Sequence, residues 1–373
     1  MFTQLKAECS DLDSTECVYW SEFCEWNEEE NQCQEIGGGG GGDINYGPYQ
    51  FSYLTESDGI RNGPDYMDGL LYYPLEANPP YKSIVLTPGW GGGSSSMTGW
   101  AEFFASYGFV AMTIGPNDEY NDSHEMRAEG LIDAIETIKE EDFRANSPLF
   151  GAVDPNRFIV SGYSMGGGAS QVALMLDHPY VNESIVGSIA LNPTIIFEDC
   201  DVCIDSEYCI CLVPEFLEHN IPTLIIAGQN EIYELPDYDG LLGQDIYENT
   251  PESTVKMLYE IENGNHGSAE ISAGEVQEKV LHWVNYHLLE DLSYCDSLLV
   301  EPTNSAQFLT TLVCEGLLVY DLNNDGVINN SDLISLAMFI LYENESLNSL
   351  DINFDLNIDI IDILLFSDYL ESI

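Results

Sequence analysis

Short apolar runs alternate with amphipathic stretches through residues 43–316. The runs rich in β-branched and aromatic residues predict strands, and the stretches with a period near 3.6 residues predict helices. The predicted strands are Gln50–Tyr53, Leu70–Tyr73, Ser83–Leu86, Phe109–Ile114, Phe158–Ser161, Ile185–Leu191, Thr223–Ala227 and Val255–Ile261. The predicted helices are Trp100–Tyr107, Glu125–Glu140, Gly167–Leu176 and Gly274–Leu289. Alternating strands and helices predict an α/β fold, a mostly parallel sheet with helices on both faces, in which the first two strands form an antiparallel edge.

Two different segments flank this central region. Residues 1–42 contain four cysteines and end in the glycine run Gly37–Gly42, which is typical of a flexible linker. Such a short segment needs covalent staples to fold. Residues 317–373 are acidic, lack Lys and Arg, and contain a repeat. We therefore expect a small cysteine-rich module, a catalytic-sized domain over 43–316 and a third module over 317–373.

The charge balance excludes several classes of partner. The formal net charge is -56, so nucleic acid and anionic membrane surfaces would be repelled. Hydrophobic residues make up 45% and aromatic residues 11%, which is enough for a packed core and argues against acidic disorder. No apolar run is long enough to predict a membrane span. The acidic surface suits salt water or cation binding.

The ten cysteines fall into three local groups, at 9–33, at 200–211 and at 295 and 314. Even, local groups favour disulfides in an oxidising compartment, although reduced structural cysteines are the alternative. The group Cys200, Cys203, Cys209 and Cys211 is interpreted as two disulfides in a surface loop, with a zinc site as the alternative. The start of the chain lacks the apolar core of a signal peptide, which we expect to have been trimmed from a secreted or cell-surface protein.

The strongest chemical signal is Gly162-Tyr163-Ser164-Met165-Gly166, which follows a predicted strand and precedes a predicted helix. A Gly-x-Ser-x-Gly in that context is the nucleophile elbow of α/β hydrolases. Its glycines permit the tight turn, and the helix N-terminus favours the charge of a tetrahedral intermediate. Ser164 is therefore the predicted nucleophile.

In α/β hydrolases the acid and then the histidine follow the serine along the chain. Among the six histidines, His266 lies in a Gly-rich loop directly after the last predicted strand, so it is the predicted base. The predicted acid is Glu231, the first carboxylate after the strand Thr223–Ala227. Glu234 and Asp237 are the alternatives. The backbone N–H groups of Trp90 and Met165 are the predicted oxyanion donors.

These motifs together resemble the cutinase-like polyester hydrolases, which include bacterial poly(ethylene terephthalate) hydrolases, over about residues 50–314. The resemblance rests on Pro88–Trp90, Trp100–Ile114, Gly162–Gly168, Pro222–Glu231, Asn263–Ser268 and the pair Cys295 and Cys314. It implies an α/β hydrolase fold with an open cleft, the roles given above for the site residues, and a disulfide Cys295–Cys314. The chain departs from the family in having Asn192-Pro193-Thr194 where an aromatic wall is usual, and in the insert Cys200–Cys211.

The C-terminal repeat consists of two Asp/Asn-rich loops, each followed by an apolar helical run, Leu333–Leu341 or Ile363–Leu370. Oxygen ligands at loop positions 1, 3, 5, 7 and 12 predict EF-hand-like calcium sites, with a metal-free turn as the alternative. The tandem pair resembles type I dockerin modules, which implies a cohesin-like or cell-surface partner. Gly326 occupies the sharp turn of the first loop and Leu356 that of the second. The predicted ligands are Asp321, Asn323, Asp325, Val327, Asp332, Asp351, Asn353, Asp355, Asn357 and Asp362.

The leading hypothesis is a secreted serine esterase that hydrolyses polyesters or hydrophobic esters through an acyl-enzyme. It needs no cofactor for catalysis, with calcium purely structural, and we expect the hydrolase domain to be monomeric. A carbohydrate esterase that removes acetyl or feruloyl groups is the alternative, favoured by the dockerin-like module. The third hypothesis, a scaffold protein with an inactive hydrolase fold, is disfavoured by the complete Ser, Glu and His order.

Overall fold

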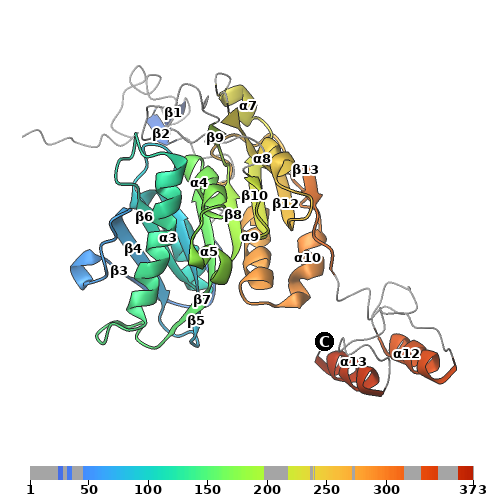
Figure 1. The fold of residues 1–373 in the computed structure, drawn as a ribbon. Coiled ribbons are helices and arrows are strands. Elements are labelled where there is room, and N and C mark those ends of the chain that lie inside the picture. The colour runs from blue at the N-terminus through green and yellow to red at the C-terminus, as the bar shows by residue number, and fades with distance from the viewer. Residues whose placement is uncertain are drawn as a thin grey trace, which may run out of the picture. The chain divides into compact units, whose positions relative to one another are not determined.

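The computed structural model describes most of the central region and parts of both flanks (Figure 1). Its described residues are 24–27, 32–35, 45–196, 217–235, 238, 240–270, 274–314, 329–342 and 360–372. The chain separates into two compact units, Met1–Thr311 and Leu312–Ile373. No helix in the described ranges is long and apolar enough to cross a membrane.

A nine-stranded sheet forms the centre of the first unit, in the order β13-β12-β10-β8-β7-β5-β6-β4-β3. The strands from β12 to β6 in that order pair in parallel, while β3, β4 and β13 are antiparallel to their neighbours. The strands are β3 Phe51–Leu54, β4 Met67–Pro74, β5 Tyr81–Thr87, β6 Val110–Gly115, β7 Val153–Tyr163, β8 Ile185–Leu191, β10 Thr223–Gly228, β12 Lys256–Ile261 and β13 Ser305–Thr310. The mostly parallel sheet and its antiparallel first edge are therefore confirmed.

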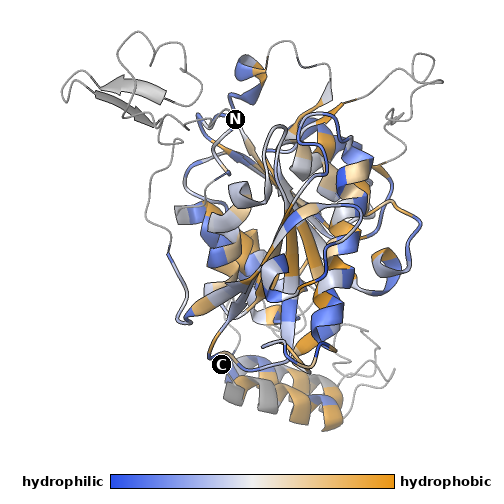
Figure 2. Cartoon of the chain, turned by 90° about the vertical axis from the view of Figure 1, so that its left-hand side faces the viewer, coloured by the Kyte–Doolittle hydropathy of each residue, from blue (hydrophilic) through white to orange (hydrophobic). Residues whose placement is uncertain are grey.

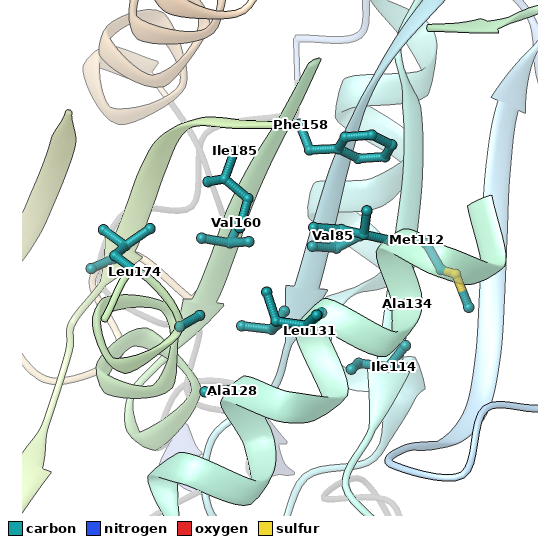
Figure 3. Packing of buried hydrophobic residues seen from close by; sticks show 14 of the residues in the cluster. Val85, Met112, Ile114, Ala128, Leu131, Ala134, Phe158, Val160, Leu174 and Ile185 are labelled. Carbon is teal, nitrogen blue, oxygen red and sulfur yellow. The ribbon is translucent and has the colours of Figure 1, made fainter. Parts of the chain in front are cut away.

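Consecutive residues of the central strands are buried, because helices cover both faces of this sheet. Val85 of β5 and Val160 of β7 belong to a core cluster with Leu131 and Ala134 of the long helix α3 (Figure 3). Ile159, the neighbour of Val160, points to the opposite face. There, the helices α2 and α9 bury further apolar side chains, Trp283 of α9 among them.

The helices of this unit occupy the segments between the strands. They are α2 Thr98–Ser106, α3 His124–Glu141, α4 Met165–Ala173, α5 Pro179–Glu183, α7 Glu231–Glu234, α8 Gly243–Asn249, α9 Gly274–His287 and α10 Cys295–Leu299. The four predicted helices correspond to α2, α3, α4 and α9. Coloured by hydropathy, the sheet shows apolar strands enclosed between helices that are polar on their outer sides (Figure 2).

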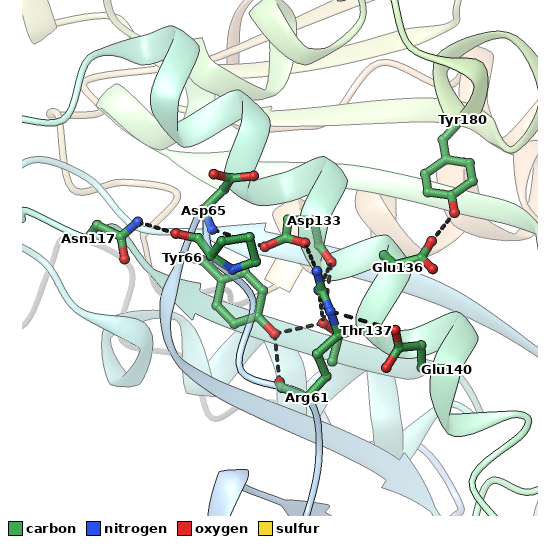
Figure 4. A network of polar contacts seen from close by, with 10 residues as sticks. Arg61, Asp65, Tyr66, Asn117, Asp133, Glu136, Thr137, Glu140 and Tyr180 are labelled. Carbon is green, nitrogen blue, oxygen red and sulfur yellow. Dashed lines mark hydrogen bonds and ion pairs between the residues drawn. The ribbon is translucent and has the colours of Figure 1, made fainter.

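A polar network joins the segment before β4 to α3 (Figure 4). Arg61 Nη2 donates to Asp133 Oδ1 at 2.5 Å, and its Nη1 donates to Thr137 Oγ1 at 2.9 Å. The hydroxyls of Tyr66 and Thr137 lie 2.7 Å apart, and the Asp65 N–H donates to the other oxygen of Asp133 at 3.0 Å. The buried side chains of Tyr66, Asp133 and Thr137 thus have hydrogen-bond partners, and the contacts join α3 to the segment before β4.

Two small antiparallel strand pairs and the two helices of the second unit are also described. Strands β1 Cys24–Asn27 and β2 Gln32–Glu35 form an antiparallel pair, as do β9 Ile195–Ile196 and β11 Gly240–Leu241. In the second unit, α12 Asn330–Tyr342 and α13 Ile360–Ser372 contain the two helical runs predicted after the acidic loops. The cysteines at 200–211 and the loop residues 321–327 and 351–357 lie outside the described residues.

Candidate active site

Ser164 lies in a sharp turn between β7 and α4, which is the position that the sequence predicts for a nucleophile. Its backbone has φ 54° and ψ -120°, a conformation that non-glycine residues rarely adopt. Its N–H donates to the Leu191 carbonyl at 2.9 Å, and its carbonyl accepts the Gly168 N–H at 3.0 Å. These bonds stabilise the strained turn and fix the side chain beyond the end of the strand.

The glycines of the elbow are required by close approach of neighbouring backbone. A Cβ on Gly166 would collide with the carbonyl oxygens of Thr87 and Pro88, at the end of β5. A Cβ on Gly162 would collide with the carbonyl of Gly166 itself. The turn can therefore form only where side chains are absent, which explains the Gly-x-Ser-x-Gly spacing physically.

His266 projects from the loop between β12 and α9 towards the serine. Its Nε2 lies 2.8 Å from Ser164 Oγ, which is a hydrogen-bond distance. The two residues are far apart in sequence, and the parallel sheet brings them together at the carboxyl ends of β7 and β12. An imidazole in this position can remove the hydroxyl proton of Ser164.

Glu231 begins α7 and is 2% exposed. Its Oε1 lies 3.7 Å from His266 Nδ1, which is an ion-pair distance but longer than a hydrogen bond. The same oxygen accepts the Gly228 N–H at 3.0 Å and an amide N–H of Asn192. Among the described residues, the buried His266 Nδ1 has no hydrogen-bond partner, so Glu231 is the carboxylate placed to orient it.

The alternative acids have different positions. Glu234, at the other end of α7, accepts the backbone N–H of His266 at 2.8 Å, so it contacts the main chain and not the imidazole. Asp237 lies outside the described residues. The Tyr163 hydroxyl donates to the His266 carbonyl at 3.0 Å, and burial raises the pKa of Tyr163, which keeps it a neutral donor. The backbone of His266 is thus held on both sides.

The loop after β5 passes close to the serine. A Cβ on Gly89 would lie 2.9 Å from Ser164 Cβ, so the chain here can approach the serine only as glycine. Trp90, the next residue, is 65% exposed, and its indole N–H donates to the Tyr120 carbonyl at 3.1 Å. Met165 is the first residue of α4, directly after the serine. Trp90 and Met165 thus directly follow Gly89 and Ser164, two residues that lie close together, and their role as oxyanion donors stays a prediction.

A buried arginine, Arg127, donates hydrogen bonds to the backbone of the loop after β5. The Arg127 guanidinium donates to the carbonyl oxygens of Pro88, Gly89 and Glu119 at 3.1, 3.3 and 2.9 Å. Arg127 is 1% exposed, and burial lowers its pKa to about 10, so it stays charged at neutral pH. The sequence does not predict this role of Arg127, because one basic residue on a helix carries no local signal of such contacts.

With this geometry in view, similarity to known proteins decides the type of enzyme. Residues 43–194 match a family model described as PET hydrolase-like. Cutinase est1 of Thermobifida alba is 28% identical over 258 residues, which cover 69% of this chain and 76% of that protein. A bis(hydroxyethyl) terephthalate hydrolase of Streptomyces coelicolor is 24% identical over 255 residues, 66% of this chain and 70% of its own. The chain is a carboxylic-ester hydrolase that is similar to the cutinases. Its fold is that of the α/β hydrolases.

Cys295 and Cys314 of this ester hydrolase are both disulfide-bonded, in agreement with the bridge that the family resemblance implies. Of the two differences from the family, the segment Asn192-Pro193-Thr194 lies within the described residues. Asn192 is wholly buried behind the serine, and Thr194 donates its N–H to the Ser164 carbonyl at 3.1 Å. This segment therefore supports the elbow and the acid.

Of the predicted calcium ligands, Asp332 and Asp362 are described. Both are wholly buried, and they occupy the first turns of α12 and α13. The Asn329 N–H donates to the Asp332 carboxylate at 2.9 Å. Within the described ranges, no group of three or more His, Cys, Asp or Glu could hold a metal ion. The other eight predicted ligands lie outside those ranges, so calcium binding stays a prediction.

Proposed function

We propose that this hydrolase cleaves hydrophobic carboxylic esters, polyesters among them, with Ser164 as nucleophile, His266 as base and Glu231 as orienting acid. The observation that carries the proposal is the 2.8 Å contact between His266 Nε2 and Ser164 Oγ at a strained elbow. The similarity to cutinases and to a terephthalate-ester hydrolase supports the substrate class.

In the proposed reaction, Ser164 Oγ attacks the ester carbonyl carbon while His266 Nε2 takes the hydroxyl proton. The N–H groups of Trp90 and Met165 donate to the oxyanion of the tetrahedral intermediate. His266 then gives the proton to the departing alcohol, which leaves an acyl-enzyme on Ser164. Water, activated by the same imidazole, attacks that ester and releases the acid. Glu231 stabilises the imidazolium in both halves.

Exposed aromatic side chains near the site support a hydrophobic polymer as substrate. Trp90 is 65% exposed and contacts Tyr120, itself 59% exposed, edge to face at 5.1 Å. Tyr233, two residues after Glu231, is 78% exposed. Rings left in water next to a nucleophile offer apolar area to a flat aromatic ester, at a small cost in side-chain entropy.

The test is the release of soluble acid from a polyester film by the parent enzyme and by Ser164→Ala. We expect a loss of about 10³-fold or more, with the same melting temperature, because only the nucleophile is removed. A fluorophosphonate probe should label the parent and not the variant. Activity within tenfold of the parent would refute Ser164, and absence of labelling in the parent would favour an inactive fold.

The carbohydrate esterase is the second candidate, and the two acidic repeats favour it because of their resemblance to dockerin modules. Comparing acetate release from acetylated xylan with acid release from polyester film separates the two substrate classes. We expect the higher kcat/KM on the polyester-like ester. The opposite ranking would make the protein a polysaccharide esterase with the same proposed triad.

We also propose that the C-terminal unit binds calcium through the ten ligands predicted from its loops. The equivalent positions of Asp332 and Asp362 support this, since each carboxylate is buried in the first turn of the helix that follows its loop, where position 12 of a calcium loop supplies its last ligand. Bound calcium would supply structural support to the loops. A chelator should lower the melting temperature of this unit and leave activity on a small soluble ester unchanged. Loss of that activity would show that calcium also supports the hydrolase domain.

The proposed partner of this unit is a cohesin-like or cell-surface protein. Ile334 and Met338, one turn apart on α12, are 62% and 53% exposed, and Leu364, which occupies the position of Ile334 in the second repeat, is 58% exposed. Such side chains suit an apolar contact. The disulfide-bonded Cys295 and Cys314 support secretion, because disulfides persist in oxidising compartments.

A further inference from the structure

Asn192 is a buried polar residue at the end of β8 that the proposed mechanism does not use. It is 0% exposed, and its backbone has φ 42°, in the left-handed region. Asparagine tolerates this region better than most residues, because its short amide can bond nearby backbone. Its own N–H donates to the Ile226 carbonyl of β10 at 2.7 Å, which fixes its backbone. The side chain of Asn192 therefore extends from a backbone position that the sheet holds in place.

The amide of Asn192 bonds two separate parts of the site. Its Nδ2 donates to Glu231 Oε1, the oxygen that faces His266 Nδ1. Its Oδ1 accepts the Ala269 N–H at 2.7 Å, and its Nδ2 also lies 3.3 Å from the Asn265 carbonyl. Asn265 and Ala269 lie on either side of His266 in the loop after β12. One amide therefore connects the acid to the loop that carries the base.

The need for this connection follows from the acid. A glutamate has one methylene more than an aspartate, and therefore one more rotatable bond, so its carboxylate requires more restraint to stay beside the imidazole. Gly228 N–H and the Asn192 amide supply two donors to the same oxygen. A neutral amide can donate to the carboxylate and accept from the loop at once, whereas a second carboxylate could only accept.

We propose that Asn192 is a positioning residue that holds the Glu231 carboxylate and the His266 loop in a fixed position relative to each other. The proposal rests on the proposed function, because it gives Asn192 an effect only through that acid and base. Asn192 does not touch the reacting ester. Its contribution appears in kcat, since the orientation of His266 matters when the proton moves, and not in the binding of substrate.

The experiment measures kcat and KM on a soluble p-nitrophenyl ester for Asn192→Gly in two backgrounds, parent and Glu231→Ala. Glycine accepts the positive φ, so the substitution removes the side-chain bonds without new backbone strain. We expect kcat to fall about 10–100-fold in the parent, with KM within about threefold. In the Glu231→Ala background the same substitution should lower kcat by a clearly smaller factor, because one of its two targets, the carboxylate, is already absent and only the bonds to the His266 loop remain to be lost.

Asp68→Gly is the control for loss of a side chain at positive φ, because Asp68 of β4 also has a φ of 56° but is exposed and lies outside the loops of the site. It should leave kcat unchanged. If Asn192→Gly does not fold, Asn192→Asp is measured in the same two backgrounds. It keeps the size and the tolerance of positive φ but loses both amide donors. An equal loss of kcat in both backgrounds, or a kcat like the parent's, would overturn the proposal. If Ser164→Ala retains activity, the proposed function itself fails, which distinguishes the two outcomes.

Discussion

Replacing Arg127 with methionine tests whether a buried cation holds the loop that precedes Trp90. The guanidinium makes bonds to four carbonyl oxygens, those of Pro88, Gly89, Glu119 and Asp122, at 2.9 to 3.3 Å. Two of these carbonyls belong to the residues directly before Trp90. Methionine keeps most of the apolar stem but donates to none of them.

The magnitude follows from those bonds. A buried acceptor left without a donor costs about 1–3 kcal/mol, and some of the four carbonyls will relax towards water. We expect a loss of about 3–5 kcal/mol in the free energy of unfolding, as is typical when one partner of a buried charged contact is removed. In a domain of this size, 1 kcal/mol lowers the melting temperature by about 2–4 °C, so the expected fall is about 6–20 °C.

The catalytic effect is separate from the loss of stability. Loss of one oxyanion donor typically lowers kcat 10²–10³-fold, and a displaced donor costs less. Arg127→Met should therefore lower kcat about 10–100-fold on a soluble ester, assayed well below its melting temperature, with Arg127→Lys intermediate. Arg61→Met is the matched control. It removes a partly buried arginine bonded to Asp133 and Thr137 of the same helix, so it should destabilise the domain and leave kcat unchanged.

A variant Arg127→Met that is folded and keeps kcat within about twofold of the parent would refute this reasoning. It would show that the glycines and the neighbouring turn hold the loop without the arginine. An equal loss of kcat in Arg61→Met would also contradict it, because the effect would then come from general loosening of the domain.

Three further predictions concern pH, the elbow and salt. Burial lowers the pKa of His287 to about 3, so below pH 6.5 the unfolded chain binds a proton at this residue that the folded chain does not bind, and the free energy of unfolding falls as the pH is lowered from 6.5 to about 3. His287→Gln should therefore make the melting temperature depend less on pH in this range. A pH dependence parallel to the parent's would contradict this. Gly166→Ala should abolish activity and lower the melting temperature, because its Cβ would collide with the Thr87 carbonyl. The control Gly187→Ala should do neither, because its Cβ would lie 3.5 Å from the nearest neighbouring atom. Normal activity of Gly166→Ala would refute the packing argument. With a net charge of -56, the melting temperature should rise with sodium chloride towards about 1 M at constant calcium, since screening shortens the range of repulsion, and a flat or falling series would count against salt adaptation.

The sequence alone predicted where the central strands and helices follow one another along the chain, and that most strands of the sheet are parallel. The runs at Ser83–Leu86, Ile185–Leu191 and Thr223–Ala227 are mainly apolar and do not alternate with exposed polar residues, because both faces of a central parallel strand are buried. The sequence did not predict β13, the second antiparallel edge, because a strand without a fully buried residue has a weak apolar pattern.

For the site, local sequence was enough where the chemistry depends on a local turn. The elbow at Ser164 needs glycines whose positions are fixed within a few residues, and chain order then selected His266 and Glu231. Tertiary structure decided what holds these groups. Asn192 bonds Ala269 across a separation of 77 positions, and Arg127 reaches carbonyls 38 and 39 positions away. An amide or a guanidinium has the same local pattern in a solvated loop as in a buried site, so only the folded chain shows which backbone groups it meets.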